Sequence, residues 1–176
     1  MGLYIVVNGL PGSGKSTLAA PLARRLGLPL ISKDTIKDAF LAEFGPRAGE
    51  WTKVLGRASI AAMYAVAMEC DRAVLDSFFS RQYAPADLSK LPGDLLEIYC
   101  RCPLDVARRR YAERSSRRHE GHDEPDLDAA FLRWQADGDD RPLGISPVLD
   151  VDTSGRVNLE EVAEWIITHS GSRRLG

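Results

Sequence analysis

The feature that most constrains the fold is residues 9–16, with the sequence Gly-Leu-Pro-Gly-Ser-Gly-Lys-Ser. A glycine at each end of a four-residue spacer, followed by lysine and a hydroxyl residue, is the P-loop pattern, in which consecutive backbone N–H groups surround phosphate oxygens. Gly12 and Gly14 carry no Cβ that would obstruct an anion, and both can adopt a positive φ. Lys15 can approach the β- and γ-phosphates, and Ser16 can offer a hydroxyl to Mg²⁺. The segment therefore predicts a nucleotide phosphate site.

The sequence around this loop has the alternation expected of a P-loop protein. An apolar run at residues 3–7 precedes the loop, and a helix-favouring segment at 16–26 follows it. Four further strand candidates are separated by helical patterns; they lie at 28–31, 72–76, 95–100 and 147–152. Strands that alternate with helices predict a parallel sheet with helices on both faces, which is a three-layer α/β fold.

Length and composition limit the possible organisation and partners. A chain of 176 residues with 44% hydrophobic content predicts one domain over 1–176. The net charge of −2 gives no whole-protein footprint for nucleic acid. No signal-peptide pattern or membrane-length apolar run is present, and the three cysteines suit reduced structural thiols. We therefore expect a cytoplasmic protein with no membrane partner, as a monomer or a homodimer.

Two carboxylates follow predicted strands. Asp34 lies where the strand at 28–31 passes into a helix, and such junctions face the ligand crevice of an open parallel sheet. It can act as a base or substrate ligand, or it can cap the helix. Asp76 ends the strand at 72–76 in the Walker B arrangement, where an acid can hold Mg²⁺ directly or through water.

Sequence motifs define the acceptor side of the site less clearly than the nucleotide side. Residues 51–70 predict a long helix, rich in alanine and methionine, that we expect to be mostly buried. Trp51 begins this helix and is a candidate for shaping the substrate site, although an apolar stripe more often belongs to a core. Ser77 and Arg81 follow Asp76 and can face the acceptor or the surface. We assign Lys37 to the same acceptor region.

Seven arginines lie between 101 and 118, and an acidic segment follows them. A basic block on a helix commonly forms a solvated face. After the fourth strand of a nucleotide-binding fold, however, it can form a lid whose arginines neutralise the transferring phosphate. We place this lid at about 108–126. Arg110 and Arg114 are one helical turn apart and are its best candidate pair.

These segments together resemble the P-loop kinases of the AAA_33 type. This group includes the kinase domain of polynucleotide kinase and, more distantly, chloramphenicol phosphotransferase and zeta toxins. The resemblance rests on 9–17, 32–34, 74–76, 108–118 and 151–154. It implies a five-stranded sheet in the order 2-3-1-4-5.

The resemblance also implies roles for particular residues. Asp34 would accept the proton of the attacking hydroxyl, lid arginines would approach the transferred phosphate, and Thr153 would lie near the adenine. The chain departs from polynucleotide kinases at 77–79, where Ser-Phe-Phe follows the third-strand acid. Two bulky apolar residues favour an apolar pocket for a small acceptor over a groove for a nucleic-acid end.

The sequence therefore predicts an ATP-dependent kinase that phosphorylates a hydroxyl of a small molecule, a metabolite or an antibiotic. The alternatives are a polynucleotide 5′-hydroxyl kinase, a kinase with a nucleoside monophosphate acceptor, and a nucleotide-binding regulatory protein without transfer activity. The predicted site comprises catalytic Asp34, Lys15, Arg110 and Arg114; ATP contacts at Gly12, Ser13, Gly14, Lys15, Ser16, Thr17, Arg110 and Thr153; Mg²⁺ ligands Ser16 and Asp76; and substrate contacts at Asp34, Lys37, Trp51, Ser77 and Arg81.

Overall fold

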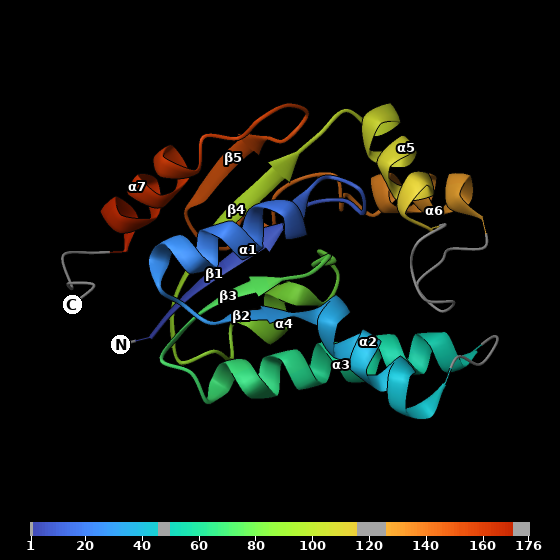
Figure 1. Cartoon of the computed structure of the whole chain (residues 1–176), viewed down its shortest axis with the longest axis horizontal. Helices are drawn as coiled ribbons and strands as arrows, with labels where there is room; N and C mark the ends of the chain where they lie inside the picture. The colour runs from blue at the N-terminus through green and yellow to red at the C-terminus, as the bar shows by residue number, and fades with distance from the viewer. Residues whose placement is uncertain (1, 46–49, 116–125, 171–176) are drawn as a thin grey trace.

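Five parallel strands form one sheet in the order β2-β3-β1-β4-β5 (Figure 1), as the resemblance implies. The structure is a computed structural model that describes residues 2–45, 50–115 and 126–170. The strands are β1 (Gly2–Asn8), β2 (Leu30–Ser32), β3 (Arg72–Asp76), β4 (Gly93–Arg101) and β5 (Val148–Asp152). The helices are α1 (Lys15–Leu26), α2 (Lys33–Phe44), α3 (Glu50–Met68), α4 (Ala84–Leu88), α5 (Leu104–Ser115), α6 (Leu127–Ala136) and α7 (Leu159–His169). The predicted three-layer α/β class is confirmed.

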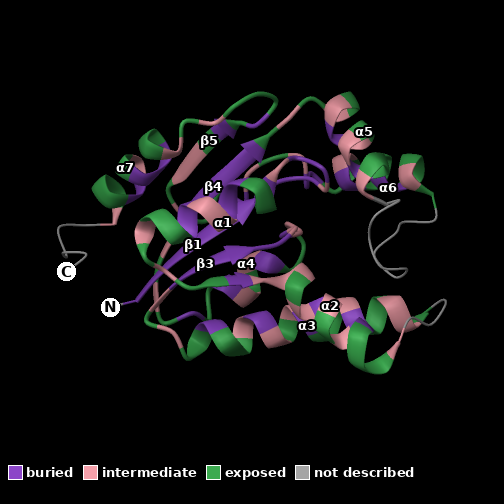
Figure 2. Ribbon diagram, in the orientation of Figure 1, coloured by how far each residue is buried: buried purple, intermediate pink, exposed green. Residues whose placement is uncertain are grey.

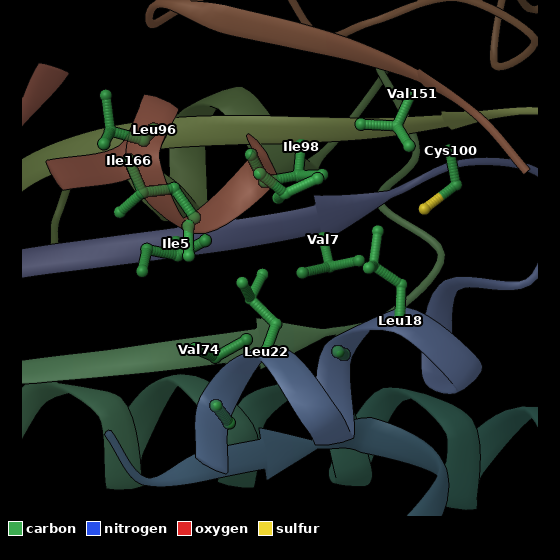
Figure 3. Packing of buried hydrophobic residues seen from close by; sticks show 14 of the residues in the cluster. Ile5, Val7, Leu18, Leu22, Val74, Leu96, Ile98, Cys100, Val151 and Ile166 are labelled. Atoms are coloured by element: carbon green, nitrogen blue, oxygen red, sulfur yellow. The ribbon is translucent and has the colours of Figure 1, made fainter. Parts of the chain in front are cut away.

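The central strand β1 is buried along its whole length because helices cover both faces of the sheet (Figure 2). Its side chains alternate between two cores. Ile5 and Val7 belong to the core beneath α1 and α7 (Figure 3), whereas Tyr4 and Val6 belong to the core on the opposite face, which includes residues of α3 and α4. The P-loop therefore follows a strand that is anchored on both faces.

The expectation that the long helix at 51–70 is mostly buried is wrong. Only a stripe of α3 is buried, while its outer face is exposed (Figure 2). The stripe recurs every four residues, at Leu55, Ser59, Met63 and Ala67, because α3 packs against α2 and the sheet while its opposite face is exposed. Val66 and Met68 lie on the exposed face at 49% and 53% exposure.

Two pairs of helices flank the carboxyl ends of the strands. α2 and α3 lie on the side of β2 and β3, and α5 and α6 lie on the side of β4 (Figure 1). The short helix α4 was not predicted, because five residues are too few to give a helical period. Within the described ranges, no helix has both the length and the apolar character that a membrane span requires.

Candidate active site

The P-loop requires glycine at position 12 for two independent reasons. Gly12 has a φ of 87°, which strongly favours glycine. A Cβ at this position would also collide with the carbonyl oxygen of Ala107 in α5. The loop is therefore packed against α5 so closely that only a bare backbone fits.

Lys15 lies within this loop and is buried. Its Nζ donates a hydrogen bond to the carbonyl oxygen of Leu10 at 2.8 Å. Burial lowers the pKa of the ammonium group to about 8, although the nearby Asp76 carboxylate opposes the shift. A bound phosphate would supply the negative charge that this buried cation favours.

Asp76 and Ser16 lie together at the end of β3. Ser32 Oγ donates to Asp76 Oδ2 at 3.2 Å, and the Ser16 hydroxyl lies close enough to the Asp76 carboxylate to lower its pKa. Burial raises the pKa of Asp76, while these hydroxyl groups and the Lys15 charge oppose the increase. A hydroxyl and a carboxylate are the oxygen donors that Mg²⁺ prefers, so the two predicted metal ligands fit that ion.

Asp34 lies in the first turn of α2, at the carboxyl end of β2. Ser32 occupies the N-cap position in an extended conformation, so Asp34 does not cap the helix. The Asp34 carboxylate accepts from Lys33 Nζ at 3.1 Å, and its side chain is 37% exposed. This position leaves the carboxylate accessible from the space in front of the sheet.

A cavity of about 270 Å³ brings the two halves of the predicted site together. Its donor side includes Lys15, Ser16 and Asp76, and its opposite side includes Asp34. The substrate candidates Lys37 and Ser77 also line it, as does Phe78. The sequence analysis missed Lys33, Thr52, Lys53, Ile60, Tyr111 and Trp134, all of which line the same cavity.

A second cavity, of about 530 Å³, adjoins the other side of the P-loop. Gly12, Gly14 and Thr17 line it together with Arg110 and with Thr153, for which the resemblance implies a place near the adenine. Thr153 Oγ1 donates to the carbonyl oxygen of Ser13 at 2.5 Å, which joins the segment after β5 to the P-loop. The two cavities meet at Gly14 and Arg114, which line both.

The two predicted lid arginines differ in the cavities that they line. Arg110 donates to the carbonyl oxygens of Thr153 and Ser154 at 2.8 and 2.9 Å, on the side of the second cavity. Arg114 lines both cavities, and its charge lowers the pKa of Lys15. This placement favours Arg114 over Arg110 as a contact for the transferred phosphate.

The rest of the basic block does not form one face. Arg108 makes an ion pair with Asp128 and lies over the ring of Phe131 at 5.7 Å, so it connects α5 to α6. Arg117 and Arg118 belong to the segment 116–125 of the predicted lid, which lies outside the described residues.

Two predicted substrate residues and one predicted pocket residue lie elsewhere. Arg81 donates its backbone N–H to Asp139 at 2.7 Å and its guanidinium to the carbonyl oxygen of Pro142. Trp51 is half-buried in α3, beside the cavity-lining Thr52. Phe79 packs in the core beneath α3 and α4, so only Phe78 of the Phe-Phe pair lines the cavity. Consecutive side chains after a strand diverge, and the sequence could not show which of the two faces the pocket.

The strand order and the P-loop together place the chain in the class of P-loop kinase folds. The family model AAA_33, described as an AAA domain, matches residues 5–138, and the chain belongs to this family. A solved protein of Chloroflexus aurantiacus with a provisional kinase name is 29% identical to it. That alignment covers 96% of this chain and 97% of the other, with a TM-score of 0.84.

Curated relatives match shorter regions. A shikimate kinase of Paracidovorax citrulli is 62% identical over 34 residues, which are 19% of each chain. A cytidylate kinase of Methanobrevibacter smithii is 26% identical over 121 residues, which are 65% of this chain and 66% of the relative. The chain therefore matches about a fifth of the first relative and just under two thirds of the second.

Proposed function

We propose that the protein is an ATP-dependent phosphotransferase that moves the γ-phosphate to a hydroxyl group of a small molecule. The observation that carries this proposal is the cavity that Asp34 shares with Lys15, Ser16 and Asp76. Phosphoryl transfer requires mainly positioning and charge neutralisation, and the cavity offers groups for both tasks. The kinase names of the relatives support the same class of reaction.

The donor nucleotide would occupy the second cavity and extend across the P-loop. Its base and ribose would lie near Thr153 and Arg110, and its phosphates would lie along the backbone N–H groups after Gly12. Lys15, which lines the first cavity, and Arg114, which lines both, would hold the γ-phosphate. Ser16 and Asp76 would hold Mg²⁺, which supplies charge neutralisation to the phosphates when it is bound.

Asp34 would act on the acceptor. Its carboxylate would orient the hydroxyl group and accept its proton as the oxygen bonds to the γ-phosphorus and ADP leaves. In the free protein Lys33 Nζ forms an ion pair with this carboxylate. Asp34 is therefore the residue whose removal should separate nucleotide binding from transfer.

Two alternatives differ in the acceptor. A cavity of about 270 Å³ is smaller than a typical drug-sized site of ~300–1,000 Å³, which favours a small acceptor over an oligonucleotide end. A nucleoside monophosphate is the second candidate acceptor, because of the match to the cytidylate kinase. A regulatory protein that only binds nucleotide would not require Asp34.

Location in the cytoplasm stays a prediction from the sequence.

The test is acceptor-dependent ADP formation from ATP and Mg²⁺, measured against sugars, nucleosides, aminoglycosides, phenicols and 5′-hydroxyl oligonucleotides. We expect a small hydroxyl compound to stimulate turnover, and Asp34→Asn to lower kcat at least ~10²-fold, as general bases do. ATP affinity should be retained in this variant. Glu43→Gln is the matched control, because Glu43 is an exposed acid on the same helix.

Two outcomes would contradict the proposal. Nucleotide binding with no acceptor-dependent ADP formation would favour the regulatory alternative. An unchanged rate in Asp34→Asn would show that another group takes the proton.

A further inference from the structure

The acceptor cavity has cationic side chains on its acceptor side as well as beside the P-loop. Two carboxylates, Asp34 and Asp76, line it, against five cationic side chains. The cations are Lys15, Lys33, Lys37, Lys53 and Arg114. Lys15 and Arg114 flank the P-loop, whereas the three other lysines come from α2 and α3, on the acceptor side. The acceptor side of the cavity therefore carries three lysines and the Asp34 carboxylate.

The three acceptor-side lysines differ in exposure. Lys33 and Lys53 form ion pairs with Asp34 and Glu50, and the Lys53 side chain is 69% exposed. Lys37 is only 5% exposed, although it lines the cavity. An anion that approaches Lys37 would enter a partly desolvated site, where attraction between opposite charges is stronger than in water.

Lys37 also has a fixed relation to Asp34. The two residues are three positions apart on α2, so they lie on neighbouring parts of one helix face, with Cβ atoms about 5–6 Å apart. Both line the cavity. A ligand whose anionic group binds Lys37 would therefore place a nearby carbon, and its hydroxyl group, within reach of Asp34.

Three aromatic residues also line the cavity. Phe78 and Trp134 line the cavity with ring centroids 5.4 Å apart, and Tyr111 lies in the same wall. Such rings give an apolar surface for the carbon skeleton of a ligand. The cavity combines this surface, a base and a buried cation in a small volume.

We propose that the acceptor is a small hydroxyl compound that carries a carboxylate or phosphate group, and that Lys37 binds this anionic group. The inference depends on the phosphotransferase function proposed above and specifies its substrate class. The anionic group anchors the acceptor on α2, the carbon skeleton lies against the aromatic wall, and the hydroxyl faces Asp34.

The test compares acceptors that differ in charge but share a skeleton. Gluconate is paired with glucitol, quinate with inositol, and glycerol 3-phosphate with glycerol, so that carboxylate and phosphate are tested separately. We expect at least one anionic member to exceed its neutral partner about 10- to 100-fold in kcat/KM, the range for a hydrogen bond to a charged group. Lys37→Met should remove this preference mainly through KM, and Lys37→Arg should restore part of it.

Two controls separate binding from folding. Lys90→Met removes an exposed lysine that pairs with Asp87, and it should leave the charge preference unchanged. The preference is a ratio between two substrates of one variant, so loss of folded protein does not alter it.

A wild-type protein that prefers the neutral partners would overturn the inference and leave the proposed function standing. Equal losses for both members of a pair in Lys37→Met would do the same. Failure of every anionic and neutral acceptor to stimulate ADP formation would instead overturn the proposed function, and this inference with it.

Discussion

The proposed nucleotide half and the proposed acceptor half of the site differ in the groups that form them. Backbone forms most of the nucleotide half: Gly12 and Gly14 have positive φ, and Arg110 and Thr153 connect the surrounding loops through carbonyl oxygens. Side chains form the acceptor half, and they come from α2, α3, α5, α6 and the segment after β3. A backbone site suits a ligand that is constant, such as a triphosphate, whereas a side-chain site can change its ligand by substitution.

The two halves also differ in how the fold supports them. The P-loop follows β1, which is buried on both faces, and packs against Ala107 of α5. The acceptor side is supported by α3, which contacts the sheet by one narrow stripe. Substitutions in the nucleotide half should therefore affect every acceptor equally, and those in the acceptor half should affect some acceptors more than others.

The largest expected effect is that of Lys15→Met in the nucleotide half. It removes the buried charge beside the proposed phosphate site, so we expect kcat/KM to fall by ~10³-fold or more for every acceptor. Steady-state kinetics measures this loss. Arg24→Met is the control, because Arg24 is an exposed cation in the last turn of the same helix. Full activity in Lys15→Met would show that the P-loop is not the donor site.

The second comparison is between Arg114→Ala and Arg110→Ala. Arg114 lines both cavities, so its loss should lower kcat by ~10²-fold. Arg110 holds Thr153 and Ser154, so its loss should mainly raise the KM for ATP, by about tenfold. The kinetic constants of both variants are measured with the same acceptor.

Arg109→Ala is the control for this pair, since Arg109 is exposed on the same helix. A larger loss of kcat in Arg110→Ala than in Arg114→Ala would assign the transferred phosphate to Arg110 instead.

The difference between the halves also explains how far the sequence could predict the site. Gly12, Lys15 and Ser16 lie close together in the sequence, so their spacing alone specified the local geometry. Asp34 and Asp76 were found because the carboxyl ends of parallel strands meet at one edge. The sheet order came from the resemblance, because strand periodicity shows no order.

The acceptor half could not be predicted in the same way. Trp134 and Tyr111 lie on α6 and α5, and a helical pattern shows neither which wall they form nor what they face. Phe78 and Phe79 are equivalent in sequence, but one lines the cavity and the other packs in the core. Arg81 was considered for the acceptor side because it follows Asp76 closely in the sequence. Its partners, Asp139 and Pro142, come from a loop that is distant in the sequence.

The smallest expected effect concerns pH and returns to Lys15. Burial lowers the pKa of its ammonium group to about 8, and bound phosphates should raise that pKa again. The free protein therefore loses this proton as pH rises through about 8, and nucleotide binding at pH 9 should take up about one proton. Affinity for the nucleotide should fall about tenfold between pH 7 and pH 9.

Calorimetry of AMPPNP binding in two buffers of different ionisation enthalpy measures the proton uptake directly. Lys15→Arg is the control, because arginine stays charged throughout this range and should bind without uptake. The same pKa has the opposite consequence for folding: the unfolded chain holds more protons between about pH 8 and 10.5, so the contribution of Lys15 to stability rises with pH there. Binding that weakens while stability from this residue increases would distinguish titration of Lys15 from a general loss of structure at high pH. Equal proton uptake by the wild type and Lys15→Arg would assign the proton to another group.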